Sequence, residues 1–116
     1  SWILHASTNP KTIQCPFAAV QSVLSGKWSI LLLHYIEKGS IRFGELHRKL
    51  EGISQASLAK QLRQLEKDGL IIRHVYPQVP PRVEYELSEI GKEFTLVLNR
   101  IDDFGKKYIA YMQKRP

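Results

Sequence analysis

The apolar residues of this 116-residue chain change their spacing near residue 70. Up to that point they recur every three or four residues, which is the spacing of amphipathic helices. Beyond it Val83, Tyr85 and Leu87 alternate with two glutamates, as in a strand that buries one face. The sequence therefore predicts a helical body followed by a β-ribbon, and it contains no internal repeat that would suggest another architecture.

Three helices are expected in the first 50 residues. The first begins at Pro16, which favours the first turn of a helix, and ends before Gly26. The second covers about residues 28–38, and a short β segment (40–42) and a two-turn helix (43–50) follow it. The predicted apolar face of the second helix consists of Trp28, Leu31, Leu32, Tyr35 and Ile36.

A fourth helix is predicted from Ser54 to Asp68. The Ser54 hydroxyl can accept a hydrogen bond from a free backbone N–H of the first turn, and Gly69 suits the end of the helix. The apolar stripe of this helix is narrow, because it consists only of Leu58, Leu62 and Leu65. The opposite side therefore carries amides and cations, with no acidic residue before Glu66, and we expect it to face outward.

A β-ribbon and a long helix are expected in the last part of the chain. Residues 70–76 form the partner of strand 83–87, and three of the six prolines lie in the loop between them. The final helix is predicted from residue 88 to about 112. Its apolar seam consists of Ile90, Phe94, Val97, Ile101, Phe104 and Tyr108. Leu98, Ile109 and Met112 widen that seam, so the helix is expected to contact more than its own domain.

This order predicts an α+β, mostly helical winged helix-turn-helix, with a recognition helix at 54–68, a wing at 70–87 and a dimerisation helix at 88–112. In this layout the second helix of the motif enters the major groove of DNA. Glutamine can pair with adenine edges, and lysine and arginine with guanine or phosphate. The predicted DNA-binding residues are Gln55, Ser57, Lys60, Gln61, Arg63, Gln64 and, on the wing, Arg82.

The distribution of charge agrees with a polyanionic partner. The net charge is +6, and residues 38–82 contribute +5 of it through nine basic and four acidic residues. One alternative is an ordinary solvated helix face, because Lys, Arg and Gln are common surface helix formers. Another is a winged helix that contacts protein or RNA, but an apolar outward face would then be expected, and Lys60, Arg63 and Lys67 do not provide one.

Several other classes of protein are disfavoured. No apolar run exceeds five residues, whereas a membrane-spanning helix needs about 20. The single cysteine, Cys15, fits a reducing compartment, so the cytoplasm is expected. The four histidines lack metal-ligand spacing, and Glu45 occupies the lysine position of the phosphate-loop-like segment 39–44. We therefore predict a protein without enzymatic activity, metal or cofactor.

Several short motifs together resemble one family. They are Cys15-Pro16, Gly26-Lys27-Trp28, Gly52-Ile53-Ser54-Gln55, the run at 62–70 and the run at 76–85. Over about residues 14–110 the chain resembles the HxlR-type winged helix-turn-helix regulators of prokaryotes. Gln78 occupies a position at which relatives often carry an acidic residue. This difference affects only the expected charge of the wing. Residues 1–12 are expected to be a flexible arm and 13–116 a single domain of this type.

The resemblance implies a homodimeric transcription factor that binds double-stranded DNA at a palindromic operator. Its first and last helices would form the dimer interface through Phe17, Val20, Phe94, Val97, Ile101, Phe104 and Tyr108. A monomer in which the last helix packs wholly against the first is the alternative. A small-molecule effector is a further candidate partner, with Trp28, Tyr35 and Phe104 lining a cleft, although core packing is the simpler role for these three.

Cys15 is a candidate redox or electrophile sensor. It directly precedes Pro16 at the start of the first helix, where the helix dipole favours a thiolate. Some HxlR-type relatives resemble sensors that use a cysteine at the matching position. The alternative is a small buried hydrophobe at the dimer interface, since cysteine is among the most buried residue types.

Overall fold

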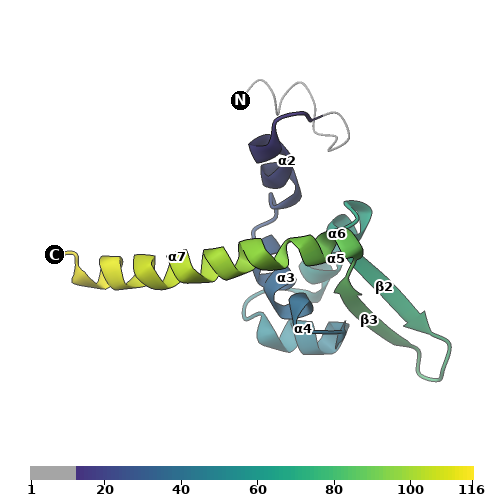
Figure 1. The fold of residues 1–116 in the computed structure, drawn as a ribbon. Coiled ribbons are helices and arrows are strands. Elements are labelled where there is room, and N and C mark those ends of the chain that lie inside the picture. Colours follow the sequence, from purple (N-terminus) through teal and green to yellow (C-terminus); the bar gives the residue numbers. More distant parts are fainter. Residues whose placement is uncertain (1–12) are drawn as a thin grey trace.

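Helices account for most of residues 13–116, the part of the chain that the computed structural model describes (Figure 1). The predicted arm at 1–12 lies outside the described residues. In chain order the elements are α2 (Pro16–Val23), α3 (Ser29–Glu37), β1 (Ile41–Arg42), α4 (Phe43–Lys49), α5 (Gln55–Lys67), β2 (Ile71–Tyr76), β3 (Arg82–Leu87), α6 (Glu89–Glu93) and α7 (Thr95–Lys114). This order confirms the predicted α+β, mostly helical winged helix-turn-helix fold.

The core lies where α3, α4 and α5 meet one another and the sheet. Seven of its side chains are almost completely removed from solvent: Leu32, Leu33, Ile36, Leu46, Leu58, Leu62 and Leu65. Ile71, Tyr85 and Leu87 contribute the buried face of the sheet, and Leu98 adds a contact from α7. Burial of this apolar surface is the main force that holds the helices to the sheet.

The buried face of α3 differs from the predicted one. Leu31 was expected inside but is 43% exposed, whereas Leu33 was not expected inside and is fully buried. The cause is the position of α3, which contacts both β3 and α7 and is therefore covered on more than one side. A single helical stripe does not describe a helix in that position.

The sheet has three antiparallel strands in the order β1-β3-β2. Ile71 pairs with Leu87 and Tyr76 with Arg82 along the ribbon, and Ile41 pairs with Tyr85. The alternation of side chains places Tyr85 and Leu87 on the core face and the two glutamates of β3 on the opposite face. The ribbon formed by β2 and β3 extends from the body as the predicted wing (Figure 1).

The predicted single helix from residue 88 is divided at Phe94 into α6 and α7. The Phe94 N–H donates to the Gly91 carbonyl (3.0 Å) three residues back, so the chain bends there while its dihedral angles stay helical. The bend has a packing cause. Gly91 lies against the Leu70 carbonyl so closely that a Cβ would overlap it, and α7 must turn from this fixed point to bury Leu98.

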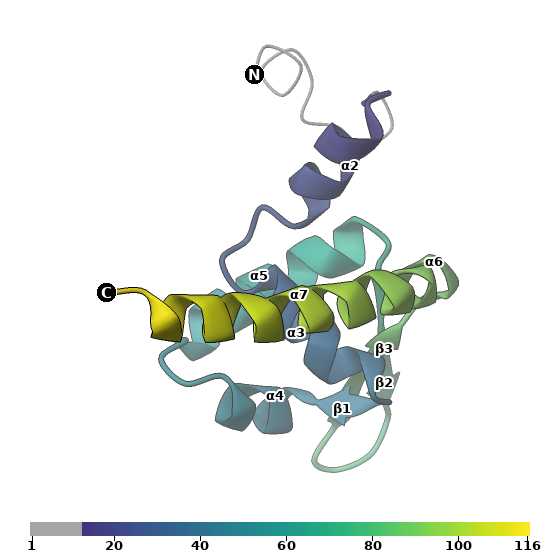
Figure 2. The ribbon, with the colours of Figure 1, turned by 60° about the vertical axis from the view of Figure 1, so that its left-hand side comes forward.

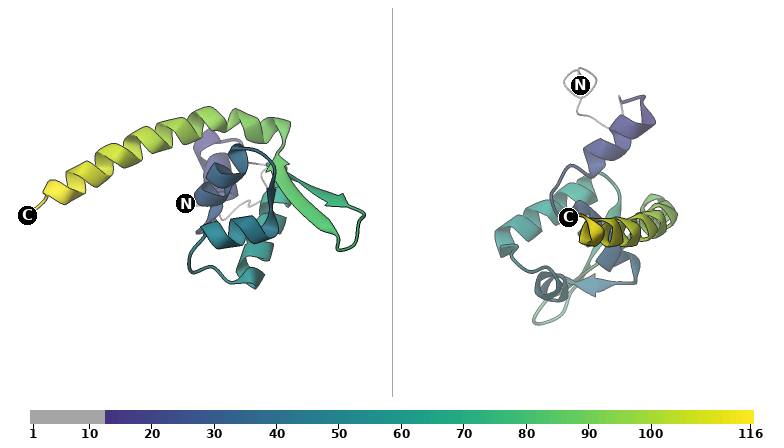
Figure 3. Two further views of the ribbon diagram at one scale, coloured as in Figure 1. Left: turned by 90° about the horizontal axis from the view of Figure 1, so that it is seen from below. Right: turned by 90° about the vertical axis from the view of Figure 1, so that its left-hand side faces the viewer.

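Two helices leave the body. α2 projects away from the other helices (Figure 1), and the C-terminal part of α7 extends well beyond the rest of the described chain (Figure 3). Figure 2 shows α7 crossing over α3 before it leaves. Within residues 13–116, no helix is both long enough and apolar enough to cross a membrane.

Candidate nucleic-acid interface

The first turn of α5 is fixed by the cap that the sequence predicts. The Ser54 hydroxyl accepts a hydrogen bond from the Ser57 backbone N–H (3.1 Å), and Ser54 itself has extended backbone angles. At the other end Gly69 has φ of +83°, in the left-handed region that favours glycine. α5 therefore begins and ends as expected.

The buried side of α5 fixes which side chains face outward. Leu58, Leu62 and Leu65 are each at most 1% exposed, because they pack into the core. The exposed residues of the helix are Gln55, Ala56, Ser57, Lys60, Arg63, Gln64, Glu66 and Lys67. Seven of these eight residues are polar, and three are cationic against one acidic, so the helix presents hydrogen-bond donors and net positive charge to its surroundings.

The two glutamines in the second half of α5 are less free than their neighbours. Gln61 is half-buried, and its side-chain oxygen lies against Gly26 in the segment before α3. Gln64 is exposed but donates from Nε2 to Asp68 Oδ1 (3.2 Å). Of the predicted DNA-binding residues on this helix, Gln61 is therefore the one that faces its own chain.

The turn between α4 and α5 is held by a side chain that the sequence analysis did not single out. His47 Nε2 lies 2.9 Å from the Ile53 carbonyl oxygen, and Ile53 itself is buried. Gly52 adopts φ of +89° within the same turn. These contacts set the direction in which α5 leaves α4, and therefore the side of the molecule on which its polar face appears.

Arg82, the predicted DNA-binding residue of the wing, is occupied by its own ribbon. Its guanidinium lies 4.2 Å from the centre of the Tyr76 ring, across the strand pair. Its Nε is 3.2 Å from Glu84 Oε2, an ion pair without hydrogen-bond geometry. Arg82 therefore stabilises the end of the ribbon next to the wing loop in this structure.

Arg73 is a basic wing residue that the sequence analysis missed. It is exposed and forms no ion pair with any other residue of 13–116. Its pairing with Tyr85 places it on the same sheet face as the core and α5, whereas Arg82 lies on the opposite face. The alternation of side chains along β2 indicates on which sheet face Arg73 lies. The pattern is hard to see in the sequence because only Ile71 of that strand is buried.

The outer face of the wing carries a network of charges. Glu84 forms ion pairs with Arg82 and Arg42, and His74 Nε2 is 2.9 Å from Glu86 Oε1. The hydrogen bond with His74 holds the pKa of the Glu86 carboxyl below its ordinary value of 4.5. This face is therefore internally neutralised, which leaves the opposite face, with α5 and Arg73, as the more positive one.

The predicted interface residues on the terminal helices are solvent-accessible. Phe17, Phe104 and Tyr108 are at least half exposed, Val20 and Val97 are slightly less so, and Phe94 and Ile101 are half-buried. Two ring pairs, Phe104 with Tyr108 and Tyr108 with Tyr111, stack along α7 with centroids about 6 Å apart. Such apolar exposure on an isolated helix is unusual for a surface in contact with water alone.

Cys15 is half-buried and occupies the residue before the first turn of α2. Its carbonyl accepts a hydrogen bond from the Ala19 N–H (2.9 Å). Within residues 13–116 no cluster of three or more His, Cys, Asp or Glu side chains is arranged to hold a metal ion.

Comparisons with known proteins agree with this geometry. The model of the HxlR-like helix-turn-helix family matches residues 23–113. YdeP of Bacillus subtilis, an uncharacterized HTH-type transcriptional regulator, is 43% identical over 94 residues, which are 81% of this chain and 73% of YdeP. An HTH-type transcriptional regulator of Methanothermobacter thermautotrophicus is 40% identical over 99 residues, or 85% of this chain and 76% of the relative.

A solved structure extends the similarity to three dimensions. The redox regulator HypR in its reduced form matches with a TM-score of 0.81 and 35% identity, over 87% of this chain and 100% of the HypR chain. Sequence, family model and fold therefore agree. The chain belongs to the HxlR-like helix-turn-helix family, and it is a transcriptional regulator with a DNA-binding winged helix-turn-helix fold.

Proposed function

We propose that this regulator binds a palindromic operator as a homodimer and inserts α5 of each subunit into the major groove. The observation that carries the proposal is the outward face of α5, where cations and amides are exposed and the leucines are buried. The major groove admits one helix, and base edges there are read by such donors. Family membership supports DNA as the partner.

Different residues of the surface would have different roles. Gln55, Ser57, Lys60 and Arg63 are exposed on the first two-thirds of α5 and are proposed to contact base edges and phosphates. Gln64 would join them on release from Asp68. Gln61 lies against Gly26 and would act mainly by positioning the helix.

The two arginines of the wing are proposed to have different roles. Arg73 is proposed as a phosphate contact, because it is exposed on the same sheet face as α5. Arg82 reaches DNA only if it leaves the Tyr76 ring and Glu84. Substitution of Arg73 by alanine should therefore weaken duplex binding more than the same substitution of Arg82.

The dimer would be formed by the two helices that leave the body. α7 exposes Val97, Phe104 and Tyr108, and α2 exposes Phe17 and Val20. A second copy with twofold symmetry would bury these side chains. It would also place two recognition helices on one side of the duplex, and two half-sites about 34 Å apart then bind more strongly than one.

Selection of binding sites from random duplex DNA tests the proposal. The expected product is an inverted repeat with half-site centres about one helical turn apart. Enrichment of a single unrepeated site would contradict the dimeric arrangement. No enrichment at low salt would contradict operator binding by this chain.

We further propose that oxidation or alkylation of Cys15 weakens operator binding. The thiol lies at the start of α2, one of the two proposed interface helices, and the similar fold of the redox regulator HypR supports a role of this kind. With one cysteine in the chain, a disulfide would have to join two subunits or a subunit and a small thiol.

The test compares wild type with Cys15→Ser on the selected operator. An oxidant or quinone is expected to release wild type and to leave Cys15→Ser bound. Equal release of the two proteins would eliminate Cys15 as the sensor. Release of neither would favour the alternative, a packed thiol at the dimer interface.

A further inference from the structure

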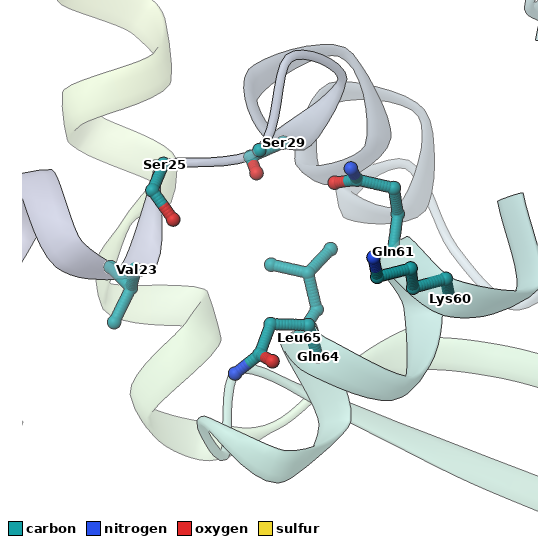
Figure 4. Close-up of a pocket in the computed structure, with 8 residues that line it drawn as sticks. Val23, Ser25, Ser29, Lys60, Gln61, Gln64 and Leu65 are labelled. Atoms are coloured by element: carbon teal, nitrogen blue, oxygen red, sulfur yellow. The ribbon is translucent and has the colours of Figure 1, made fainter. Parts of the chain in front are cut away.

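A small cavity lies between α5 and the segment that joins α2 to α3. Its volume is about 150 Å³. Figure 4 shows side chains from both segments pointing into it. The lining residues are Val23, Ser25, Gly26, Ser29, Lys60, Gln61, Gln64 and Leu65. No part of the predicted small-molecule cleft, with Trp28, Tyr35 and Phe104, lines this cavity.

The polar groups of the cavity suit an anion. Lys60 contributes a cation, Gln61 and Gln64 contribute carboxamides, and Ser25 and Ser29 contribute hydroxyls. None of the eight lining residues is acidic, but the Asp68 carboxylate lies next to the cavity and accepts one of the two N–H groups of Gln64 (3.2 Å). Lys60 forms no ion pair with another residue of 13–116, so its charge is not neutralised inside the protein. A carboxamide can turn its N–H₂ or its oxygen toward a ligand, and both hydroxyls can donate.

The start of α3 adds to this positive environment. Ser29 is the first residue of the nine-residue helix α3, whose N-terminus carries the positive end of the helix dipole, while the Ser29 N–H itself donates to the Gly26 carbonyl (3.1 Å). Helix N-termini of this kind bind phosphate in many proteins. The cavity therefore combines a helix terminus with a lysine, two features that favour the same charge.

The Ser29 side chain is the second and independent sign of a ligand. Ser29 is only 3% exposed and is the one buried polar residue of the described chain. Its hydroxyl points into the cavity (Figure 4), and no residue of 13–116 forms a hydrogen bond with it. Arg82 Nε, and not this hydroxyl, is the fully enclosed side-chain polar atom of the described residues that lacks a hydrogen-bond partner, so the Ser29 oxygen opens onto the cavity, where it can bind water or a ligand.

We propose that this cavity binds one phosphate group. Its volume equals that of about five water molecules, which accommodates a phosphate with its nearest waters but not a whole nucleotide. The phosphate can belong to the DNA backbone or to a small phosphorylated molecule. The first source rests on the proposed function, because it requires α5 to lie against a duplex.

The location gives the site a consequence for regulation. Lys60 and Gln64 belong both to the cavity and to the proposed DNA-binding face, and Gln61 also lines the cavity. A phosphate in the cavity would therefore compete with DNA for these side chains if it came from solution. If it came from the backbone, the segment before α3 would become part of the DNA-binding surface.

The experiment is a titration of the full chain with inorganic phosphate, followed by amide NMR at constant ionic strength with chloride as the reference salt. Saturable shifts are expected at the backbone amides of 26–30 and at the side-chain amides of Gln61 and Gln64. Ser29→Ala and Lys60→Met should each weaken phosphate binding about tenfold. Lys67→Met, which removes an exposed cation of the same helix outside the cavity, is the matched control and should bind as wild type.

A second variant tests the cavity by filling it. A Cβ at Gly26 would displace the Gln61 side-chain oxygen and lie 2.8 Å from Ser29 Oγ, so Gly26→Ala should weaken phosphate binding. Unchanged circular dichroism would show that Gly26→Ala and Ser29→Ala are folded. Absence of saturable shifts in wild type, or equal binding by wild type and the two variants, would overturn the proposal.

Titration with a duplex at the same ionic strength separates the two sources. If the DNA backbone supplies the phosphate, Ser29→Ala should bind the duplex about tenfold more weakly. If a small molecule supplies it, Ser29→Ala should bind the duplex as wild type while its response to phosphate is lost. Failure of wild type to bind any duplex would refute the proposed function. The phosphate titration would then decide by itself whether the cavity binds phosphate.

Discussion

At the scale of single residues, one hydroxyl holds the first turn of α5. The Ser54 Oγ accepts from the Ser57 N–H, so Ser54→Ala leaves that donor without its partner. The expected loss is about 1 kcal/mol in the free energy of unfolding, measured by urea denaturation at fixed protein concentration. Ser57→Ala is the control, because it removes a hydroxyl but keeps the N–H, and should cost less than about 0.5 kcal/mol. Equal losses would contradict the cap.

The pair formed by His74 and Glu86 gives a prediction about pH. Because the hydrogen bond holds the pKa of Glu86 below 4.5, the carboxylate stabilises the folded state. This contribution is complete above the unfolded pKa of 4.5 and is lost as the pH falls through the lower folded value. His74→Ala should raise the Glu86 pKa toward 4.5, observed by carbon NMR of the carboxyl group. Ser40→Ala should raise it less, because the His74 hydrogen bond is the largest cause; the reverse order would contradict this assignment.

At the scale of elements, Lys60 tests whether α5 is the recognition helix. If Lys60 contacts a base, Lys60→Ala should weaken operator binding by about 1–3 kcal/mol. If Lys60 contacts only phosphate, the slope of log K against log salt concentration should become shallower by roughly one unit. Fluorescence anisotropy over a series of salt concentrations distinguishes the two. Lys107→Ala, an exposed position on α7, removes the same charge from the chain and should leave the isotherm nearly unchanged. An unchanged isotherm for Lys60→Ala would remove Lys60 from the interface.

The sequence predicts α5 and the wing well because their signals are local. The Ser54 cap, the three leucines and Gly69 lie within sixteen residues and define both ends and the buried side of one helix. The alternation in β3 likewise predicts its buried face. These features depend on neighbours a few residues away, which the sequence displays directly.

Other features depend on residues that meet only in the folded chain. Gln61 faces inward because Gly26 approaches it, and Phe94 marks a bend because Gly91 packs on the Leu70 carbonyl. Neither approach leaves a periodic signal. The same holds for the cavity at Ser29, whose lining comes from two separate segments. The candidate DNA-contacting face was thus largely predictable, whereas the contacts that restrain it were not.

At the scale of the whole molecule, the exposed apolar side chains of α7 require an explanation. Helix α7 has twenty residues, but only Leu98 is buried, and its C-terminal part extends beyond the rest of the described chain (Figure 3). An isolated helix end in water gains little from packing. A second copy of the chain would cover this surface, and the proposed operator binding depends on such a pairing.

Phe104→Glu should therefore separate the dimer. Phe104 is 67% exposed, so a charge there does not disturb the fold of one subunit, but it would place two carboxylates without partners in a twofold interface. Light scattering after size exclusion should give a molar mass near 13.4 kDa for the variant and twice that for wild type. Asn99→Glu is the matched control: Asn99 is exposed and lies about 140° around α7 from Phe104, so the same charge should leave the dimer intact. A wild type of 13.4 kDa at micromolar concentration, or a dimeric Phe104→Glu variant, would show that this face of α7 is not the subunit contact.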